Sequence, residues 1–471
     1  MILRGDLVHC PGLGGIEILR DHLLVVNPLG FIDYVGAAGL QESREILRSS
    51  SEPLIVLDKG TFLLPTFCDL HLHAPQFLYQ GTGLHLPLME WLNEYAFKAE
   101  ERLDADPALA ERVYIRLTES LIENGTGAVL LFGTIKVDTN LILARVMQRA
   151  GIRAFVGKLS MDLSSRPTYV EPSVSAALSS AISFVGSCHG MVSRLPSHER
   201  LVEPVLTPRF VPTCTDDLLR SLGELASARR LRIQSHMAES HDQIAYVRRE
   251  RGKTDMEIFA ESRLLTPRTV QAHCTFLDPP SLAEVARFGT AIAHCPLSNA
   301  YFSARPFPLR EALHAGVKVG LGSDIAGGYD IDIMGCMRQA VAISRMREGE
   351  RVMALTDGRL CQDDGSLAVD WREALYLATR GGAVALDLQP GAGTFAVGAP
   401  FDAQCIRLSD ASTKVGIGRL DFFEYPDQPQ LTLDMVEKWW CLGDVRNRFA
   451  MWVQGRQLWG PPLNSHSTKI S

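Results

Sequence analysis

Short apolar runs alternate with longer helix-type stretches between about residues 66 and 385, and this alternation constrains the fold more than any other feature of the sequence. The stretches 107–124, 215–229 and 281–288 are of the helical type. Such alternation is typical of parallel strands joined by helices, because each helix returns the chain to the start of the next strand. The strand candidates are 62–73, 127–132, 153–158, 203–207, 231–236, 269–273, 290–294 and 317–323.

These eight candidates match the number of strands in a closed (β/α)8 barrel of the TIM type. A doubly wound open sheet is the structural alternative. Its dinucleotide-binding version carries Gly-x-Gly-x-x-Gly after the first strand, and the sequence has no such motif there. We therefore predict an α/β fold with a TIM-like barrel over residues 66–385.

The two ends of the chain share a strand character that the middle lacks. Apolar runs occur at 16–26 and 31–35 and again at 402–407 and 448–458, where Gly455 suits a hairpin turn. No strong helix is evident in about the first sixty residues. We expect residues 1–65 and 386–471 to form one small, discontinuous β-sandwich domain beside the barrel.

The charge balance argues against polyanionic partners. Lys and Arg total 47 against 54 Asp and Glu, a net charge of -7, so no strong positive field is available for nucleic acid or an anionic membrane surface. Apolar runs end long before the roughly 20 residues of a membrane helix, and the start of the chain lacks the apolar stretch of a secretory signal. Ten cysteines without a Cys-x-x-Cys pair favour a reducing, cytoplasmic location.

Two histidines end the first strand candidate. His71 and His73 are two residues apart, so an extended backbone directs both side chains to the same face. Alone, a His-x-His pair is a weak signal, because two partly buried, hydrogen-bonded histidines would look the same. Further ligands from other strand ends are needed to indicate a metal site.

Ionisable residues recur at the ends of the later strand candidates. His236 ends the fifth candidate and Glu239 follows it, His273 and His294 end the next two, and Asp324 follows the eighth. In a barrel, the carboxyl ends of the strands meet at the rim that carries the active site. Neutral imidazoles with one carboxylate suit Zn²⁺, or Fe²⁺, with a position left for water.

These residues resemble the metal-dependent amidohydrolase superfamily, and the resemblance covers nearly the whole chain. Within that superfamily, further segments resemble the guanine deaminase family. They are His-Ala-Pro-Gln at 73–76, Tyr-x-Phe-x-x-Glu at 95–100, Thr-Pro-Arg-Phe at 207–210, Ser-His-Met-Ala-Glu at 235–239, His-Cys-Pro-Leu-Ser-Asn at 294–299 and Gly-Ser-Asp-Ile-Ala-Gly-Gly at 322–328.

The resemblance implies hydrolytic deamination of guanine to xanthine and ammonia, in purine catabolism, by water that a metal activates. It makes guanine the small-molecule partner, predicts a homodimer, and implies one Zn²⁺ per subunit, with Fe²⁺ as the other option. Lys158 could be argued as a bridge between two metals, but the resemblance makes it a packing residue. The implied metal ligands are His71, His73, His236 and Asp324.

The resemblance and the residue types together assign roles. Asp324 would accept a proton from the attacking water, Glu239 would pass protons to a ring nitrogen and the departing amine, and His273 would orient the nucleophile. Arg209 would donate to the carbonyl at carbon 6, with Gln76 at another edge of the purine. The implied substrate-binding residues are His73, Ala74, Pro75, Gln76, Arg209, Phe210, His236 and Asp324.

Other interpretations of the same residues remain open. Glu239 could be a surface carboxylate, His273 a core histidine and Arg209 a surface ion-pair partner, while Trp91 could belong to the core or to the pocket. The substrate could also be another amino-substituted heterocycle, such as a triazine, cytosine or an adenosine-type thioether. A non-catalytic scaffold is a different class, and the loss of metal ligands would be its signature.

Overall fold

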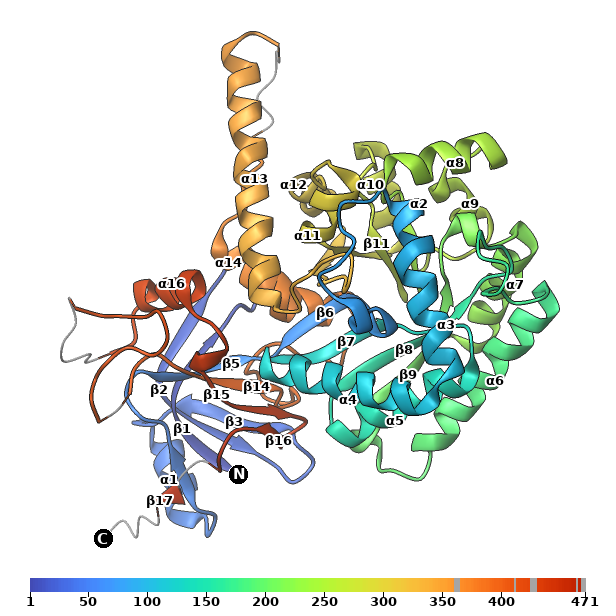
Figure 1. Cartoon of the computed structure of the whole chain (residues 1–471). Helices are drawn as coiled ribbons and strands as arrows, with labels where there is room; N and C mark the ends of the chain where they lie inside the picture. The colour runs from blue at the N-terminus through green and yellow to red at the C-terminus, as the bar shows by residue number, and fades with distance from the viewer. Residues whose placement is uncertain (360–364, 411, 424–429, 463–464, 467–471) are drawn as a thin grey trace.

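Eight parallel strands in the described part of the chain form a barrel, in which each strand pairs with the next in sequence. Figure 1 shows the computed structural model, which describes residues 1–359, 365–410, 412–423, 430–462 and 465–466. This arrangement confirms the predicted α/β fold class. The barrel strands are β6 (Phe67–His73), β7 (Thr126–Phe132), β8 (Arg153–Ser160), β9 (Val202–Pro208), β10 (Arg232–Met237), β11 (Thr269–His273), β12 (Ala291–His294) and β13 (Lys318–Leu321).

Side-chain and backbone hydrogen bonds close the seam between β6 and β13, the first and last strands of the barrel. The carboxylate of Asp69 accepts hydrogen bonds from the backbone N–H of Ser323 at 3.0 Å and from its hydroxyl at 2.5 Å. The backbone N–H of Asp324 donates to the carbonyl of His71 at 2.8 Å. The seam therefore fixes His71 and Asp324, two of the predicted metal ligands, beside each other.

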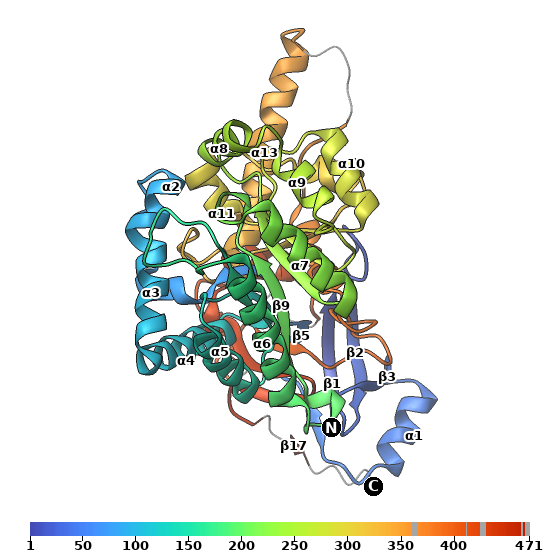
Figure 2. The ribbon, with the colours of Figure 1, turned by 90° about the vertical axis from the view of Figure 1, so that its right-hand side faces the viewer.

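Helices cover the outside of the barrel (Figure 2). Several of them begin at a capping residue that helices prefer, because a side-chain oxygen satisfies a free backbone N–H in the first turn. Asp106, Thr215 and Asp278 cap α4, α7 and α10 in this way. The helices are α2 (Leu88–Trp91), α3 (Phe97–Ala105), α4 (Pro107–Glu123), α5 (Val137–Ala150), α6 (Val174–Val192), α7 (Asp216–Arg229), α8 (His241–Arg251), α9 (Asp255–Glu261), α10 (Pro279–Phe288), α11 (Pro296–Ser298), α12 (Leu309–His314), α13 (Ile333–Thr356), α14 (Trp371–Tyr376) and α15 (Gly382–Ala385).

Strands from both ends of the chain share a second, mostly antiparallel sheet of nine strands in the described residues. β14 pairs with β5, with Cys405 opposite Leu63, and so joins the two ends. Gly455 forms the predicted hairpin turn with φ +71, and a side chain there would clash with Gly30. The strands are β1 (Ile2–His9), β2 (Glu17–Val26), β3 (Ile32–Ala37), β4 (Leu54–Val56), β5 (Thr61–Pro65), β14 (Ala403–Arg407), β15 (Arg448–Val453), β16 (Arg456–Trp459) and β17 (Ser465–His466).

Two sequence-based expectations were wrong in detail. The single strand expected at 62–73 is two strands, because the chain leaves the second sheet after β5, and β6 then starts the barrel. A helix, α1 (Gln41–Ser49), occurs in the first sixty residues, where no strong helix was expected. Its nine residues are strongly amphipathic at the helical period, so the sequence did carry a helix signal there.

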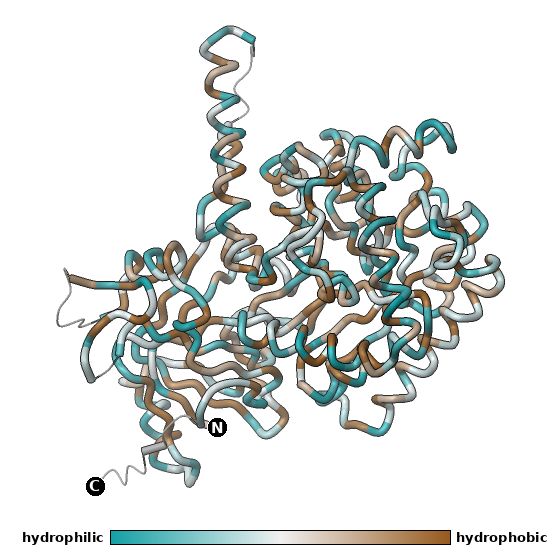
Figure 3. Tube along the Cα trace, in the orientation of Figure 1, coloured by the Kyte–Doolittle hydropathy of each residue, from teal (hydrophilic) through white to brown (hydrophobic). Residues whose placement is uncertain are grey.

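Apolar residues concentrate along the strands and the helix faces turned toward them (Figure 3). The helix α13 starts packed against the barrel, with Ile333, Met334 and Met337 buried, and only its far end extends away from the rest of the molecule (Figure 1). The helix α16 (Leu433–Leu442) packs beside the second sheet (Figure 1). Among the described helices, none combines the length and the apolar character needed to cross a membrane.

Candidate active site

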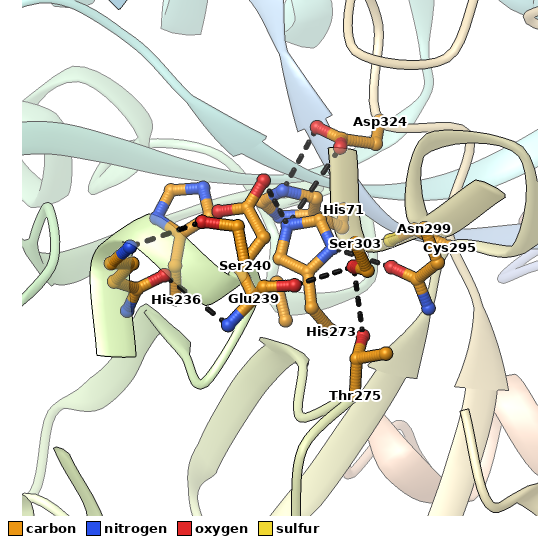
Figure 4. Close-up of polar contacts among 12 residues, drawn as sticks. His71, His236, Glu239, Ser240, His273, Thr275, Cys295, Asn299, Ser303 and Asp324 are labelled. Carbon is orange, nitrogen blue, oxygen red and sulfur yellow. Dashed lines mark hydrogen bonds and ion pairs between the residues drawn. The ribbon is translucent and has the colours of Figure 1, made fainter. Parts of the chain in front are cut away.

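The predicted ionisable residues converge at the carboxyl ends of the barrel strands (Figure 4). His71 and His73 come from β6, His236 from β10 and His273 from the last position of β11. Asp324 follows β13 after two residues, Gly322 and Ser323. Each of these five side chains is buried. Packing inside the barrel therefore holds their polar atoms in place.

Three imidazoles and a carboxylate form a cluster with the dimensions of a metal site. The ligand atoms of His71, His73 and His236 lie within 4.8 Å of one another, as do those of His71, His273 and Asp324. Oδ1 of Asp324 lies 3.1 Å from Nε2 of His71 and 3.8 Å from Nε2 of His73. The structure therefore brings together the four residues that the sequence predicts as ligands.

The protonation of these histidines fits a bound cation. Nδ1 of His236 lies 2.6 Å from the backbone carbonyl of Arg209, which can only accept, so this nitrogen carries the proton and Nε2 has a free lone pair. That Nε2 faces Nε2 of His73 at 2.9 Å. Burial first, and the neighbouring cationic groups second, lower the pKa of His71, His73 and His236 well below the ordinary value. Neutral imidazoles with converging lone pairs, next to a carboxylate, are a donor set for Zn²⁺.

Glu239 and His273 lie beside this cluster. Nε2 of His273 is 3.6 Å from Oε1 of Glu239 and 3.7 Å from Oδ2 of Asp324. Burial, followed by the charge of Asp324, raises the pKa of Glu239 well above its ordinary value. Nδ1 of His273 donates to the side-chain oxygen of Asn299 at 3.0 Å, which leaves Nε2 directed at the two carboxylates (Figure 4).

A pocket joins the cluster to the residues predicted to recognise the substrate. Arg209 is 1% exposed, and its Nη2 has no hydrogen-bond partner among the described residues. The Trp91 side chain, whose place the sequence left open, is part of the wall. The pocket is lined by His73, Gln76, Leu88, Trp91, Leu92, Arg209, Phe210, His236, Glu239, Phe302, Asp324 and Gly327. The buried Ala74 and Pro75 belong to the same turn as Gln76, η1 (Ala74–Tyr79).

The structure places two further candidates outside the cluster. Lys158 forms a buried ion pair with Glu171, in agreement with the packing role that the resemblance implies. His294 ends β12 as expected, but it lines a separate cavity beside α13 with Phe307 and Arg347. Position at a strand end therefore did not by itself bring a histidine into the cluster.

Sequence reasoning gave no role to Glu100 and Asn299, although both contact site residues. Glu100 accepts a hydrogen bond from Nη1 of Arg209 at 2.6 Å, and Asn299 accepts one from His273. Both lie in segments that carry the family resemblance, at 95–100 and 294–299. That placement was the available signal, but the contact of Glu100 spans 109 residues and has no local pattern.

Comparison with known proteins defines the class of protein. Residues 62–447 match the model of the amidohydrolase family, which is most of the chain and includes the whole barrel. The chain therefore belongs to the amidohydrolase family.

Its relatives define a narrower group, the guanine deaminases. The chain is 34% identical to guanine deaminase of Mus musculus, over 97% of this chain and 96% of the mouse chain. It is 32% identical to guanine deaminase of Dictyostelium discoideum, over 97% of this chain and 98% of that one. The crystal structure of guanine deaminase from C. acetobutylicum with guanine in its active site superposes with a TM-score of 0.82, at 28% identity, over 97% of this chain and 99% of that one.

Proposed function

We propose that this protein catalyses the hydrolytic deamination of guanine to xanthine and ammonia. One observation carries the proposal: a single pocket is lined both by Arg209 and Gln76 and by His73, His236 and Asp324 of the cluster. Hydrogen-bonding side chains next to a cluster of metal-ligand type are what the deamination of a flat base with hydrogen-bonding edges requires. The similarity to guanine deaminases over nearly the full length supports the same substrate.

We propose that His71, His73, His236 and Asp324 hold one divalent metal, Zn²⁺ or, as the second option, Fe²⁺. The converging nitrogen lone pairs and the carboxylate support this ligand set. When bound, such an ion lowers the pKa of water to about 7 and so supplies a nucleophile at neutral pH. His273 is left out of the ligand set because its Nε2 lies between two carboxylates and can orient the attacking water.

The side chains of the pocket then move the protons of the reaction. Water adds through its oxygen to carbon 2 of guanine, and Asp324 accepts a proton from it. Glu239, which burial keeps protonated by raising its pKa, gives its own proton to the adjacent ring nitrogen, and the proton taken up by Asp324 replaces it. Breaking the bond between carbon 2 and the amine nitrogen releases ammonia, which takes the second proton of the water. One water is consumed for each ammonia released.

Substrate recognition rests on three side chains. Arg209 has a free donor, Nη2, for the carbonyl at carbon 6. Gln76 would contact a second edge of the base, and Phe210 would pack against the rings. A base with an amine at carbon 6 would place a donor against the Arg209 donor, so this arrangement disfavours adenine.

Three further proposals concern the domains, the oligomeric state and the location of the protein. We propose that residues 1–65 with 386–471 form the small domain and residues 66–385 the barrel, which the pairing of β5 with β14 supports. We further propose a homodimer in the cytoplasm. The described cysteines are unpaired, and all but Cys441 are buried, which suits a reducing compartment.

Product identification tests the proposed reaction. The purified protein, loaded with Zn²⁺, is incubated with guanine, and the mixture is separated by liquid chromatography with a parallel assay for ammonia. We expect xanthine and ammonia in equal amounts. Turnover of a triazine, cytosine or an adenosine-type thioether in place of guanine would overturn the proposal in favour of another deaminase of the family.

A further inference from the structure

A buried carboxylate, Glu100 on α3, contacts two of the side chains proposed to recognise the substrate. Its Oε2 accepts a hydrogen bond from Nη1 of Arg209 at 2.6 Å, and its Oε1 accepts one from Nε2 of Gln76 at 3.3 Å. Oε1 of Gln76 in turn accepts from the backbone N–H of Ala326 at 3.1 Å. Glu100 therefore holds the two side chains in one arrangement without itself lining the pocket.

The same carboxylate balances a buried positive charge. The side chain of Glu100 is fully buried, and that of Arg209 is 1% exposed. Water screens neither charge there, so the field of Arg209 at the pocket depends on its partner. Burial would lower the pKa of Arg209, but Glu100 raises it above its ordinary value, so the guanidinium stays charged.

A compensated guanidinium acts on a ligand differently from a free one. With its charge balanced, Arg209 offers the pocket a directed N–H donor, which favours a neutral carbonyl oxygen. Without that compensation it would also present a net positive charge in a buried site, which favours an anion. The charge of Glu100 therefore affects which charge state of an oxopurine the pocket prefers.

We propose that Glu100 is a positioning and specificity-determining residue: through Arg209 and Gln76, it makes the pocket select a neutral oxopurine over an anionic one. The inference rests on the proposed function, because it takes the pocket to bind a purine. It adds to that function the exclusion of negatively charged purines, which share the ring and carbonyls of the substrate and differ from it in charge.

Two ligands without an exocyclic amine test the proposal without turnover. Hypoxanthine is neutral near pH 7, whereas urate is an anion. Their dissociation constants are measured by calorimetry at one pH for the Zn²⁺-loaded wild type and for Glu100→Gln, which keeps the shape of the side chain and removes its charge. A general loosening of the pocket would weaken both ligands alike. We therefore compare the ratio of the dissociation constants of hypoxanthine and urate within each protein, in which such an effect cancels.

The chain provides a matched control in the next residue. Glu101 is on the same helix but pairs with Arg166, at 2.8 and 2.5 Å, away from Arg209. Glu101→Gln also removes one carboxylate charge from α3. Glu100→Asp keeps the charge and serves as the conservative variant.

We expect wild type, Glu101→Gln and Glu100→Asp to prefer hypoxanthine. In Glu100→Gln the preference should shift toward urate by about 10-fold or more, which is about 1.4 kcal/mol. An unchanged ratio in folded Glu100→Gln, or the same shift in Glu101→Gln, would overturn the inference. If Glu100→Gln does not fold, the wild type alone still tests the inference. Tighter binding of urate than of hypoxanthine by the wild type would overturn it. Failure to bind either ligand would instead contradict the proposed function.

Discussion

Nδ1 of His236 donates a hydrogen bond to the backbone carbonyl of Arg209 at 2.6 Å, so one residue serves both halves of the site. Its main chain fixes the ring of a proposed metal ligand, and its guanidinium faces the substrate pocket. Outer hydrogen bonds of this kind orient metal-binding histidines and set their tautomer. Because the two tasks use different parts of Arg209, substitutions can separate them.

Arg209→Lys should impair substrate recognition and leave the metal in place. Lysine keeps the positive charge and the backbone carbonyl but loses the planar fork of donors. We expect kcat/KM for guanine to fall by about 100-fold or more, roughly 2.7 kcal/mol of transition-state stabilisation. Steady-state kinetics, together with metal analysis of the same sample, checks both statements. An unchanged guanine rate would show that Arg209 does not recognise the carbonyl.

His236→Ala should lose metal and activity together, because it removes one of three converging imidazoles. Elemental analysis after dialysis measures the metal content. His294→Gln is the matched control, because His294 is also buried at a strand end but lines the cavity beside α13. Full metal content in His236→Ala, or equal loss in both variants, would refute the ligand assignment.

The contribution of Asp104 to the free energy of unfolding should fall as the pH rises from about 4 to about 6. Burial raises its pKa to about 6 from an ordinary value of 3.8, against the opposing effects of Thr134, Thr139 and Lys136. The folded state therefore holds this proton more tightly than the unfolded state, and the resulting stabilisation, present below pH 4, is lost as the pH passes 6. A shift of about two pKa units corresponds to at most about 3 kcal/mol.

Urea unfolding at several pH values measures this effect. The free energy of unfolding of Asp104→Asn, relative to wild type, should rise by about 2 to 3 kcal/mol between pH 4 and pH 7. Glu111→Gln, at an exposed position, is the control and should show little such change. A difference between Asp104→Asn and wild type that does not vary with pH would count against the raised pKa.

Much of the barrel could be predicted because its strands are short, apolar and separated by capped helices. The predicted strands at 127–132, 153–158 and 269–273 agree with β7, β8 and β11 to within about two residues. The break between β5 and β6 was missed because residues 61–73 are buried throughout and look like one strand. The local signal for it is the pair Pro65 and Thr66, which interrupts the apolar run where the chain passes between the sheets.

The candidate site shows the same division. His71, His73, His236 and Asp324 could be predicted because barrel topology brings strand ends together and the motifs carry the family resemblance. The contact between Glu100 and Arg209 could not, because it joins α3 to the end of β9 through side-chain packing alone. Periodicity and spacing contain no information about such a pair.

The ratio of deamination rates on guanine and adenine tests the central claim most directly. Loss of guanine absorbance and formation of xanthine are followed spectrophotometrically with the Zn²⁺-loaded wild type, and adenine is assayed in parallel through its own product. A pocket whose buried Arg209 donor requires a carbonyl at carbon 6 should turn over guanine with a kcat/KM at least about 10⁴-fold higher than adenine. Comparable rates on the two bases, or no xanthine from guanine by the fully loaded protein, would contradict the account.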